Sequence, residues 1–286
     1  MRSFMGSPSI AIVVTFFGEA PSWFPAFLLS CHRNPDVQWL LYSDFEASLA
    51  VPSNVTIRRL DLDELNERAS DALGAAIRID RGSLRKICDF KPLYGRMFAD
   101  DLRGFDWWAC SDLDIIWGDV RRFMTDDVLQ RHDIVSSRRH KLSGHFTLFR
   151  NTDTINRTFE LASDVVSLLT APTYRRLDED VLTHCLRGRM GRSESDPGPR
   201  VYWQEELTIN SAYQKALPPG DGGNLLWLDG RTFDASRREY MYLHFHKLKP
   251  FMHTFDVGGD DAPGMLVINR DGIFAQRHAD LAVGHP

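Results

Sequence analysis

The stretch FDWWACSDLDIIWGD, residues 105–119, decides how the chain folds. An apolar run of this length, bounded by polar residues, is typical of a strand buried in a parallel sheet. Asp112 and Asp114 interrupt the run where the strand leaves the core, and because side chains alternate along a strand, both point the same way. Two carboxylates this close repel each other, so the pair predicts a bound cation, a shared proton or strong hydrogen bonds. The surrounding tryptophans and isoleucines enclose the pair, which favours a divalent cation over a solvated turn.

Strands and helices alternate through the first third of the chain. We expect strands at residues 10–18, 37–44 and 54–60, and helices at 21–34 and 61–74. The second helix opens with acidic residues and closes with a glycine, as the helix dipole and the C-terminal cap prefer. Such alternation predicts an α/β fold with a mixed, mostly parallel sheet flanked by helices.

Later segments extend this pattern beyond the acidic pair. In folds of this class, ligands bind outside the carboxyl ends of the strands, which is where the two aspartates are expected. We expect further helices over residues 91–103, 121–133 and 158–170, strands at 132–137, 145–151, 225–230 and 241–247, and a mobile loop over 187–200.

Composition excludes several classes of function. The chain has 286 residues, 43% of them hydrophobic, so it can bury a substantial core. A net charge of -5 and a pI near 6.1 give no basic surface for nucleic acid. The apolar segment at residues 9–17 is too short to cross a bilayer, and the four cysteines show no paired spacing. These features predict a cytoplasmic protein, with attachment to a membrane through a partner or a small apolar patch left open.

A second polar group stands near the C-terminus, in YMYLHFHKLKPF, residues 240–251. His244 and His246 alternate with apolar residues, so both can share one face of a strand, and Lys247 and Lys249 follow. A metal that carries a diphosphate needs a further ligand and balancing cations. Carboxylates with one imidazole suit Mn²⁺ better than Ca²⁺, because nitrogen is the softer donor.

These segments together resemble a known group of proteins. WWACSDLDIIWGDV resembles the D-x-D segment of the GT-A glycosyltransferases, and GHFTLFRN their later acceptor-side strand. LHFHKLKPF is similar to the His-then-Lys-Pro element of glycogenin-like and lipooligosaccharide sugar transferases. A nearer resemblance, from about residue 10 to about residue 249, is to an uncharacterised bacterial family of glycosyltransferase-like proteins from polysaccharide loci, in which CDFKPLYG and DLDIIWGD occur as a pair.

The resemblance implies a metal site for Mn²⁺ or Mg²⁺. Asp112 would meet the ribose or a metal-bound water, Asp114 would bind the metal, and His244 would complete the protein ligands. The spacing from His244 to Lys249 is one residue shorter than in the glycogenin-like pattern and lacks its glycine, so His246 is the alternative ligand. Lys247 and Lys249 would stabilise the diphosphate as it leaves.

The resemblance also implies a nucleotide diphosphate sugar as donor, with a UDP-sugar favoured. Cations would bind its phosphates and carboxylates its hydroxyl groups. The candidate residues are Arg85, Lys86, Asp89 and Lys91 in RKICDFKPLYG, with Thr15, Phe17 and Asp44 at the ends of the first two strands.

The acceptor side is expected in LDEDVLTHC, residues 177–185. Asp178, Glu179 or Asp180 would contact a sugar hydroxyl, and Asp178 or Asp180 would be the general base if the reaction inverts configuration. An ordinary acidic helix start explains the same segment equally well. The arginines of the 187–200 loop are candidates to clamp a diphosphate, namely Arg187, Arg189 and Arg192.

One catalytic domain over residues 1–286 is therefore expected. Residues 8–119 would form its nucleotide-sugar half, 120–255 its acceptor half and 256–286 an extension. The predicted reaction transfers a sugar to a hydroxyl of a bacterial polysaccharide or glycolipid. Two alternatives stay open. A phosphatase of the haloacid dehalogenase type also carries D-x-D after a strand, although on its first strand, and a non-catalytic sugar or nucleotide binder would keep the same pocket.

Overall fold

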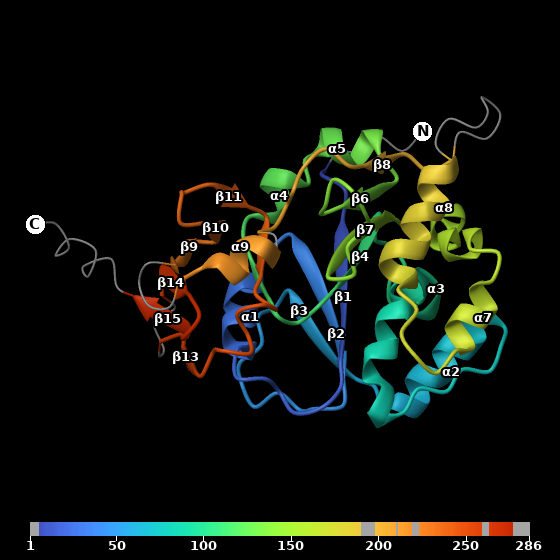
Figure 1. Ribbon diagram of the computed structural model, residues 1–286, viewed down its shortest axis with the longest axis horizontal. Helices are drawn as coiled ribbons and strands as arrows, with labels where there is room; N and C mark the ends of the chain where they lie inside the picture. The colour runs from blue at the N-terminus through green and yellow to red at the C-terminus, as the bar shows by residue number, and fades with distance from the viewer. Residues whose placement is uncertain (1–5, 190–197, 210, 219–222, 259–262, 277–286) are drawn as a thin grey trace, which may run out of the picture.

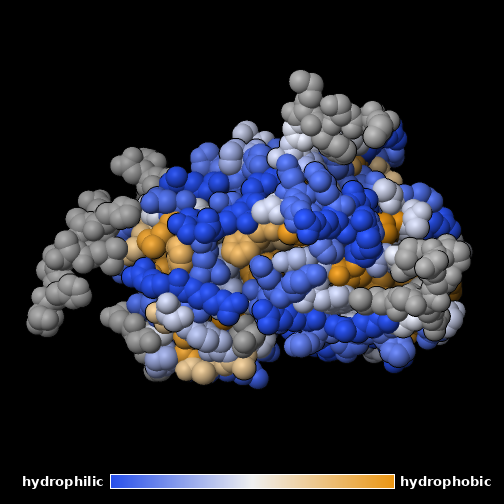
Figure 2. Space-filling view, turned by 90° about the horizontal axis from the view of Figure 1, so that it is seen from above, coloured by the Kyte–Doolittle hydropathy of each residue, from blue (hydrophilic) through white to orange (hydrophobic). Residues whose placement is uncertain are grey.

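The computed structural model describes residues 6–189, 198–209, 211–218, 223–258 and 263–276. A central sheet lies between two groups of helices, and a smaller sheet lies beside it (Figure 1). In the described part of the chain, no helix is both long and apolar enough to cross a membrane. Hydrophilic residues cover most of the face seen in Figure 2, with hydrophobic residues grouped between them.

The central sheet has seven strands. In spatial order they are β3 (Val55–Arg59), β2 (Val37–Ser43), β1 (Ile10–Phe16), β4 (Trp107–Ser111), β7 (Phe146–Arg150), β6 (Ile134–Ser136) and β8 (Val201–Tyr202). The first four strands are parallel, β7 is antiparallel to both of its neighbours, and β8 is parallel to β6. The expected mixed, mostly parallel sheet flanked by helices is confirmed.

Both faces of the central sheet are buried, which is why its strands read as continuous apolar runs. Along β1, Ile10 and Ile12 pack with α1 (Phe24–His32) on one face. Ala11 and Val13 belong to the core on the other face, with α2 (Leu62–Leu73) and α3 (Tyr94–Met97). Figure 1 shows α1 on one side of the strands and α2 and α3 on the other.

Three of the expected helices differ from the structure. The helix expected over 121–133 forms two, α4 (Val120–Phe123) and α5 (Asp126–Arg131), because Thr125 is extended and caps the second. The helix expected over residues 91–103 is wrong in position: a 3₁₀ helix, η1 (Arg81–Leu93), starts ten residues earlier and leads into α3. Asp80 starts η1 because its carboxylate accepts the N–H of Gly82. The helix expected over 158–170 is divided by Ala162, whose backbone is extended. By contrast, α2 is confirmed, with a capping box at Asp61 and a left-handed Gly74 at its end.

Several shorter helices connect the strands. They are α4 (Val120–Phe123), α5 (Asp126–Arg131), α6 (Asp153–Asn156), η2 (Thr158–Leu161), α7 (Val165–Thr170), the π-helix η3 (Leu177–Val181), α8 (Leu182–Arg189) and α9 (Ser211–Ala216). The first part of the loop expected over 187–200 is therefore the end of α8, and residues 190–197 lie outside the described residues.

A six-stranded sheet lies in the last third of the chain. Its spatial order is β11 (Glu239–Tyr240), β10 (Arg231–Phe233), β9 (Leu225–Leu228), β14 (Met265–Ile268), β15 (Gly272–Gln276) and β13 (Thr254–Asp256). Between the two sheets, β5 (Ile115–Trp117) pairs antiparallel with β12 (Tyr242–His244). This pair brings the segment after the two aspartates against the segment that carries the histidines.

Candidate metal site and its two cavities

The two aspartates lie in a short connection, and residues 105–119 are not one continuous strand. β4 ends at Ser111 in the central sheet, and β5 begins at Ile115 in its pair with β12. Asp112 and Asp114 occupy the crossing between the two sheets. The carboxylate of Asp114 is buried, whereas 32% of the Asp112 side chain is exposed, so one face of the pair is open to a ligand.

His244 completes a compact group with the two aspartates, called the metal group below. The β5–β12 register places His244 opposite Ile115, and the N–H of Phe245 donates to the Asp114 carbonyl at 3.2 Å. His244 Nε2 lies 3.3 Å from Asp114 Oδ1 and 3.6 Å from Asp112 Oδ2. One ligand atom from each residue falls within 4.8 Å of the others. Two carboxylates and one imidazole that converge in this way are a fitting donor set for Mn²⁺ or Mg²⁺.

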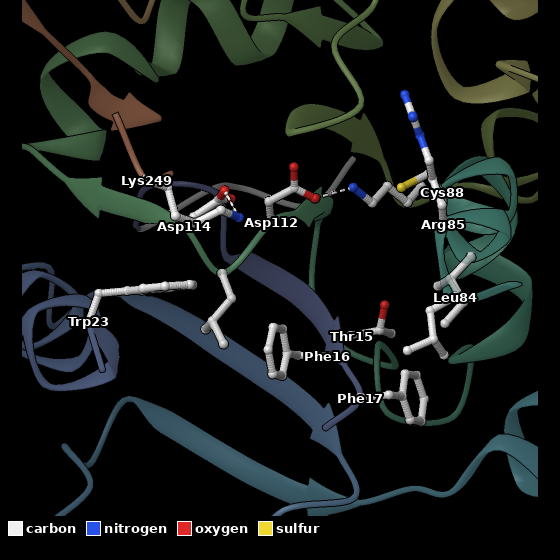
Figure 3. Close-up of a pocket in the computed structure, with 13 residues that line it drawn as sticks. Thr15, Phe16, Phe17, Trp23, Leu84, Arg85, Cys88, Asp112, Asp114 and Lys249 are labelled. Carbon is white, nitrogen blue, oxygen red and sulfur yellow. Dashed lines mark hydrogen bonds and ion pairs between the residues drawn. The ribbon is translucent and has the colours of Figure 1, made fainter. Parts of the chain in front are cut away.

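Two lysines contact the carboxylates of the metal group. Lys249 Nζ lies 2.7 Å from Asp114 Oδ2, and Figure 3 shows the two side chains meeting. Burial alone would raise the pKa of Asp114, but His244 and Lys249 hold that pKa well below its ordinary value. Lys91 contacts Asp112 and donates to the carbonyl of Gly144 at 2.6 Å. Burial alone would lower the pKa of Lys91, and the Asp112 carboxylate nevertheless raises it well above its ordinary value.

His244 is the middle ring of a stack of three histidines. Its ring centroid lies 4.1 Å from that of His145 and 4.3 Å from that of His246. His246 faces Ser211, with 3.4 Å between Nε2 and the hydroxyl oxygen. Among the described residues, His244 belongs to the metal group and His246 does not. The geometry therefore favours His244 as the ligand.

His145 was not among the residues expected from the sequence. Its Nδ1 lies 2.8 Å from the Tyr242 hydroxyl oxygen, and burial, followed by the charge of His244, lowers its pKa well below the ordinary value. The signal that would find it is strand register. β4 and β7 pair with Ser111 opposite Phe146, so the next residue on each side, Asp112 and His145, face each other where the strands part.

A cavity of about 440 Å³ opens on one side of the metal group (Figure 3). We call it the apolar cavity, because most of its other lining residues are hydrophobic. Thr15 and Phe17, which were expected beside the nucleobase, line this cavity, as do Lys91 and Lys249. The complete lining is Thr15, Phe16, Phe17, Trp23, Leu84, Arg85, Ile87, Cys88, Lys91, Asp112, Leu113, Asp114 and Lys249.

A second cavity of about 320 Å³ also borders Asp112. We call it the charged cavity. Arg85, Lys91 and Asp112 border both cavities, so the two meet at the metal group. His244, His246 and Lys247 also line the charged cavity. Two adjoining spaces, one apolar and one charged, that share a metal group suit a reaction between two different ligands.

Asp178 is the buried carboxylate of the charged cavity. It lies on the π-helix η3 and accepts a hydrogen bond from the Tyr174 hydroxyl at 2.8 Å. Gly144 is packed so closely against it that a Cβ there would collide with the carboxylate. Burial is the main reason that the pKa of Asp178 rises to about 7. A carboxylate with a pKa near neutrality is suited to accept a proton from a hydroxyl group.

The neighbours of Asp178 have different surroundings. Glu179 lines the charged cavity but is paired with Lys141 at 2.7 Å and with Arg176 at 2.8 Å. Asp180 does not line the cavity. Its side chain is 52% exposed and pairs with Arg176, so of these three carboxylates only Asp178 is both buried in the cavity lining and outside an ion pair with a described residue.

Lys86 and Asp89 have a structural role and line neither cavity. They form a fully buried pair at 2.8 Å. Asp89 also accepts the backbone N–H groups of Arg175 at 2.7 Å and Leu177 at 2.9 Å, which fixes the start of η3. The expectation that Lys86 and Asp89 contact the donor is not supported, because their polar atoms are engaged inside the protein.

Other expected donor contacts are placed as follows. Asp44 directly follows β2, accepts the N–H of Gly18 at 2.8 Å and pairs with Arg81. It does not line either cavity. Arg187 packs on Trp203, with its guanidinium carbon 4.7 Å from the ring centroid, and does not line either cavity. The side chain of Arg189 and all of Arg192 lie outside the described residues.

A family model matches most of the chain. The model is that of a family of unknown function, DUF6625, and it matches residues 12–273. The chain belongs to this family. No protein of curated function matches it in sequence.

Similar solved structures include two of the galactosyltransferase LgtC. One is a complex with donor and acceptor sugar analogues, and the other is an active-site mutant. Each is 12% identical in sequence to this chain. The match covers 59% of this chain and 68% of the LgtC chain, with a TM-score of 0.35. A likeness this remote leaves the function to be argued from the geometry of this chain.

Proposed function

We propose that this protein is a metal-dependent glycosyltransferase that moves a sugar from a nucleotide diphosphate donor to a hydroxyl group of an acceptor. One observation carries the proposal. Asp112, Asp114 and His244 converge where the apolar cavity meets the charged cavity. The acceptor's hydroxyl must reach the anomeric carbon of the donor, beside the leaving diphosphate, and this is the point where both cavities open.

The donor is assigned to the apolar cavity. Phe17 and its apolar neighbours offer a surface for a nucleobase, and the Thr15 hydroxyl, 2.7 Å from the Tyr94 hydroxyl, offers a polar contact at the strand end. A divalent cation bound by the metal group would stabilise the negative charge that develops on the diphosphate. Lys249, already 2.7 Å from Asp114, adds fixed positive charge beside it. We favour UDP as the nucleotide.

The acceptor is assigned to the charged cavity. Its hydroxyl oxygen forms the new bond to the anomeric carbon while the bond from that carbon to the diphosphate breaks. Asp178 accepts the hydroxyl proton in an inverting reaction. Lys247, which lines this cavity beside His244 and His246, faces the diphosphate from the acceptor side. By resemblance, the donor sugar is a hexose and the acceptor is a bacterial polysaccharide or glycolipid. The transfer would take place in the cytoplasm or at the inner face of the membrane.

The phosphatase alternative gains no support from the structure. Its nucleophilic aspartate belongs on the first strand, whereas β1 contains no aspartate and the acidic pair follows β4. A non-catalytic binder would use the same cavities, so a measurement of transferase activity is needed to distinguish the two hypotheses.

Thermal unfolding with UDP, GDP and CMP, each with and without Mn²⁺, tests the proposal. One diphosphate at 100 times its Kd should stabilise the native state by about 2.7 kcal/mol, which raises the Tm by about 5–10 °C. Asp114→Asn should abolish the metal-dependent part and lower transferase activity by at least about 100-fold. Asp127→Asn, a change of the same chemistry on exposed α5, is the matched control.

Each result has a defined meaning. Metal-dependent stabilisation lost only in Asp114→Asn supports the metal group. Stabilisation by a nucleotide without turnover of any sugar donor supports the binder. No response to any nucleotide, or an unchanged response in Asp114→Asn, overturns the proposal.

A further inference from the structure

The charged cavity contains more positive than negative groups. Its cationic lining residues are Arg85, Lys91, Arg138, Lys141, Arg176 and Lys247. Its carboxylates are Asp112, Asp178 and Glu179, and Asp178, with a pKa of about 7, carries only part of a charge at neutral pH. The imbalance belongs to the free protein and predicts an anionic occupant.

Three of these cations are already neutralised by carboxylates. Lys91 contacts Asp112, and Lys141 lies 2.7 Å from Glu179. Arg176 lies 2.8 Å from Glu179 and also pairs with Asp180. The surplus charge therefore belongs to the remaining three.

Arg138 and Arg85 have no carboxylate within ion-pair distance among the described residues. Arg138, in the loop between β6 and β7, places Nη2 3.1 Å from His145 Nε2. An imidazole ring carries no negative charge, so this contact leaves the charge of Arg138 unbalanced. Arg85 lies on η1, with its guanidinium carbon 5.1 Å from the ring centroid of Tyr174. Figure 3 shows its side chain extending from η1 away from Thr15 and Phe17.

The proposed donor would not consume the charge of Arg138. Its diphosphate would be balanced by the divalent cation, by Lys249, which lines the apolar cavity only, and by Lys247 from the acceptor side. Arg138 lines the charged cavity only. A guanidinium in that position faces the acceptor.

We propose that the acceptor carries an anionic group, a phosphate or a carboxylate, which Arg138 and Arg85 bind in the charged cavity. This inference rests on the proposed function, because it names the class of the acceptor. The planar guanidinium matches both oxyanions with two parallel hydrogen bonds, and two guanidiniums from separate elements would fix the orientation of the sugar.

Calorimetric titration with three sugars of similar size tests the inference. Glucose 6-phosphate and glucuronate are the charged probes, and glucose is the neutral one. Each titration is run with and without UDP and Mg²⁺, because a probe that binds through the metal would need it. We expect at least one charged probe to bind about tenfold more tightly than glucose in both conditions, and the stronger of the two identifies the anion.

Arg138→Gln should remove about tenfold of the charged probe's affinity and leave the affinity for UDP with Mg²⁺ unchanged. Unchanged UDP binding also shows that the variant is folded. Arg85→Gln, at an exposed side chain, provides the second variant. Arg187→Gln, which packs on Trp203 away from both cavities, is the matched control.

The outcomes separate this inference from the proposed function. Equal binding of charged and neutral probes, binding of none of them, or an unchanged preference in both arginine variants overturns the inference, whatever UDP does. Failure of UDP to bind counts against the proposed function, whereas the charge preference is measured without it.

Discussion

Two lysine–aspartate pairs are anchored on η1, and they differ in what surrounds them. Lys86 and Asp89 are 3% and 0% exposed, whereas the Lys91 and Asp112 side chains are 5% and 32% exposed. The first pair is enclosed by backbone partners. The second borders both cavities.

The difference lies in how fully each carboxylate is engaged. Asp89 accepts from Lys86 and from the N–H groups of Arg175 and Leu177, so it has little capacity for a ligand. Asp112 contacts Lys91 on one oxygen and lies near His244 on the other, with its open side toward the cavities. Residue type and spacing do not distinguish a structural pair from a site pair, whereas the unoccupied hydrogen-bonding capacity does.

Replacement of the two aspartates tests this contrast most strongly. Asp89→Asn leaves the Lys86 ammonium buried without a counter-charge and should lower the free energy of unfolding by about 3–5 kcal/mol. Asp112→Asn should cost about 1–2 kcal/mol, because Lys91 keeps its bond to the Gly144 carbonyl and borders the cavities. Urea unfolding followed by tryptophan fluorescence measures both. Equal losses would mean that the two pairs are structurally equivalent.

Much of the fold could be predicted from the sequence because its signals are local. Apolar runs and turn residues place β1 to β3, and Asp61 and Gly74 mark the ends of α2. The start of η1 was missed because a helix over residues 91–103 has Pro92 in its first turn, the position that proline favours, whereas Asp80 starts the segment and Pro92 lies near its end. The division of residues 105–119 between two sheets depends on β12, about 125 residues later, which no local pattern reveals.

The candidate site divides in the same way. Asp112 and Asp114 could be predicted because a buried strand ends at them, whereas His244 was expected from the family resemblance with His246 as the alternative, and the structure places His244 in the group. Lys86 and Asp89 look like ligands in the sequence, and only burial shows otherwise. His145 depends on the register of two strands. The distinction between Asp178 and Asp180 depends on which side of a π-helix faces Gly144, and hydrophobic periodicity does not report that.

Asp178 sharpens the comparison, because it is a buried carboxylate with no cation at ion-pair distance in the described part of the chain. Its folded pKa of about 7 lies above its ordinary value of 3.8. Between these two values the folded state holds a proton that the unfolded state has lost, so the contribution of this group to stability is greatest below about pH 4 and is lost as the pH rises to about 7. Up to about 4 kcal/mol depends on this group. Asp178→Asn should remove that decline from the pH profile of unfolding.

Activity should change in the opposite direction with pH. A general base must be deprotonated, so turnover should rise as the pH passes about 7. Asp178→Asn should lose this rise and lower the rate about 10²- to 10⁴-fold. A variant that retains the pH dependence of turnover would assign the proton transfer to another group.

Asp180 should give the smallest effect, although it lies two residues from Asp178. Its side chain is 52% exposed and its partner Arg176 is 44% exposed, so water already solvates both charges. Exposed pairs of this kind contribute under about 1 kcal/mol, and Arg176 retains Glu179 as a second partner at 2.8 Å. Asp180→Asn should therefore change the unfolding free energy by less than about 0.5 kcal/mol and leave turnover within about twofold. A loss comparable to that of Asp178→Asn would place Asp180 at the acceptor and reverse the assignment made from burial.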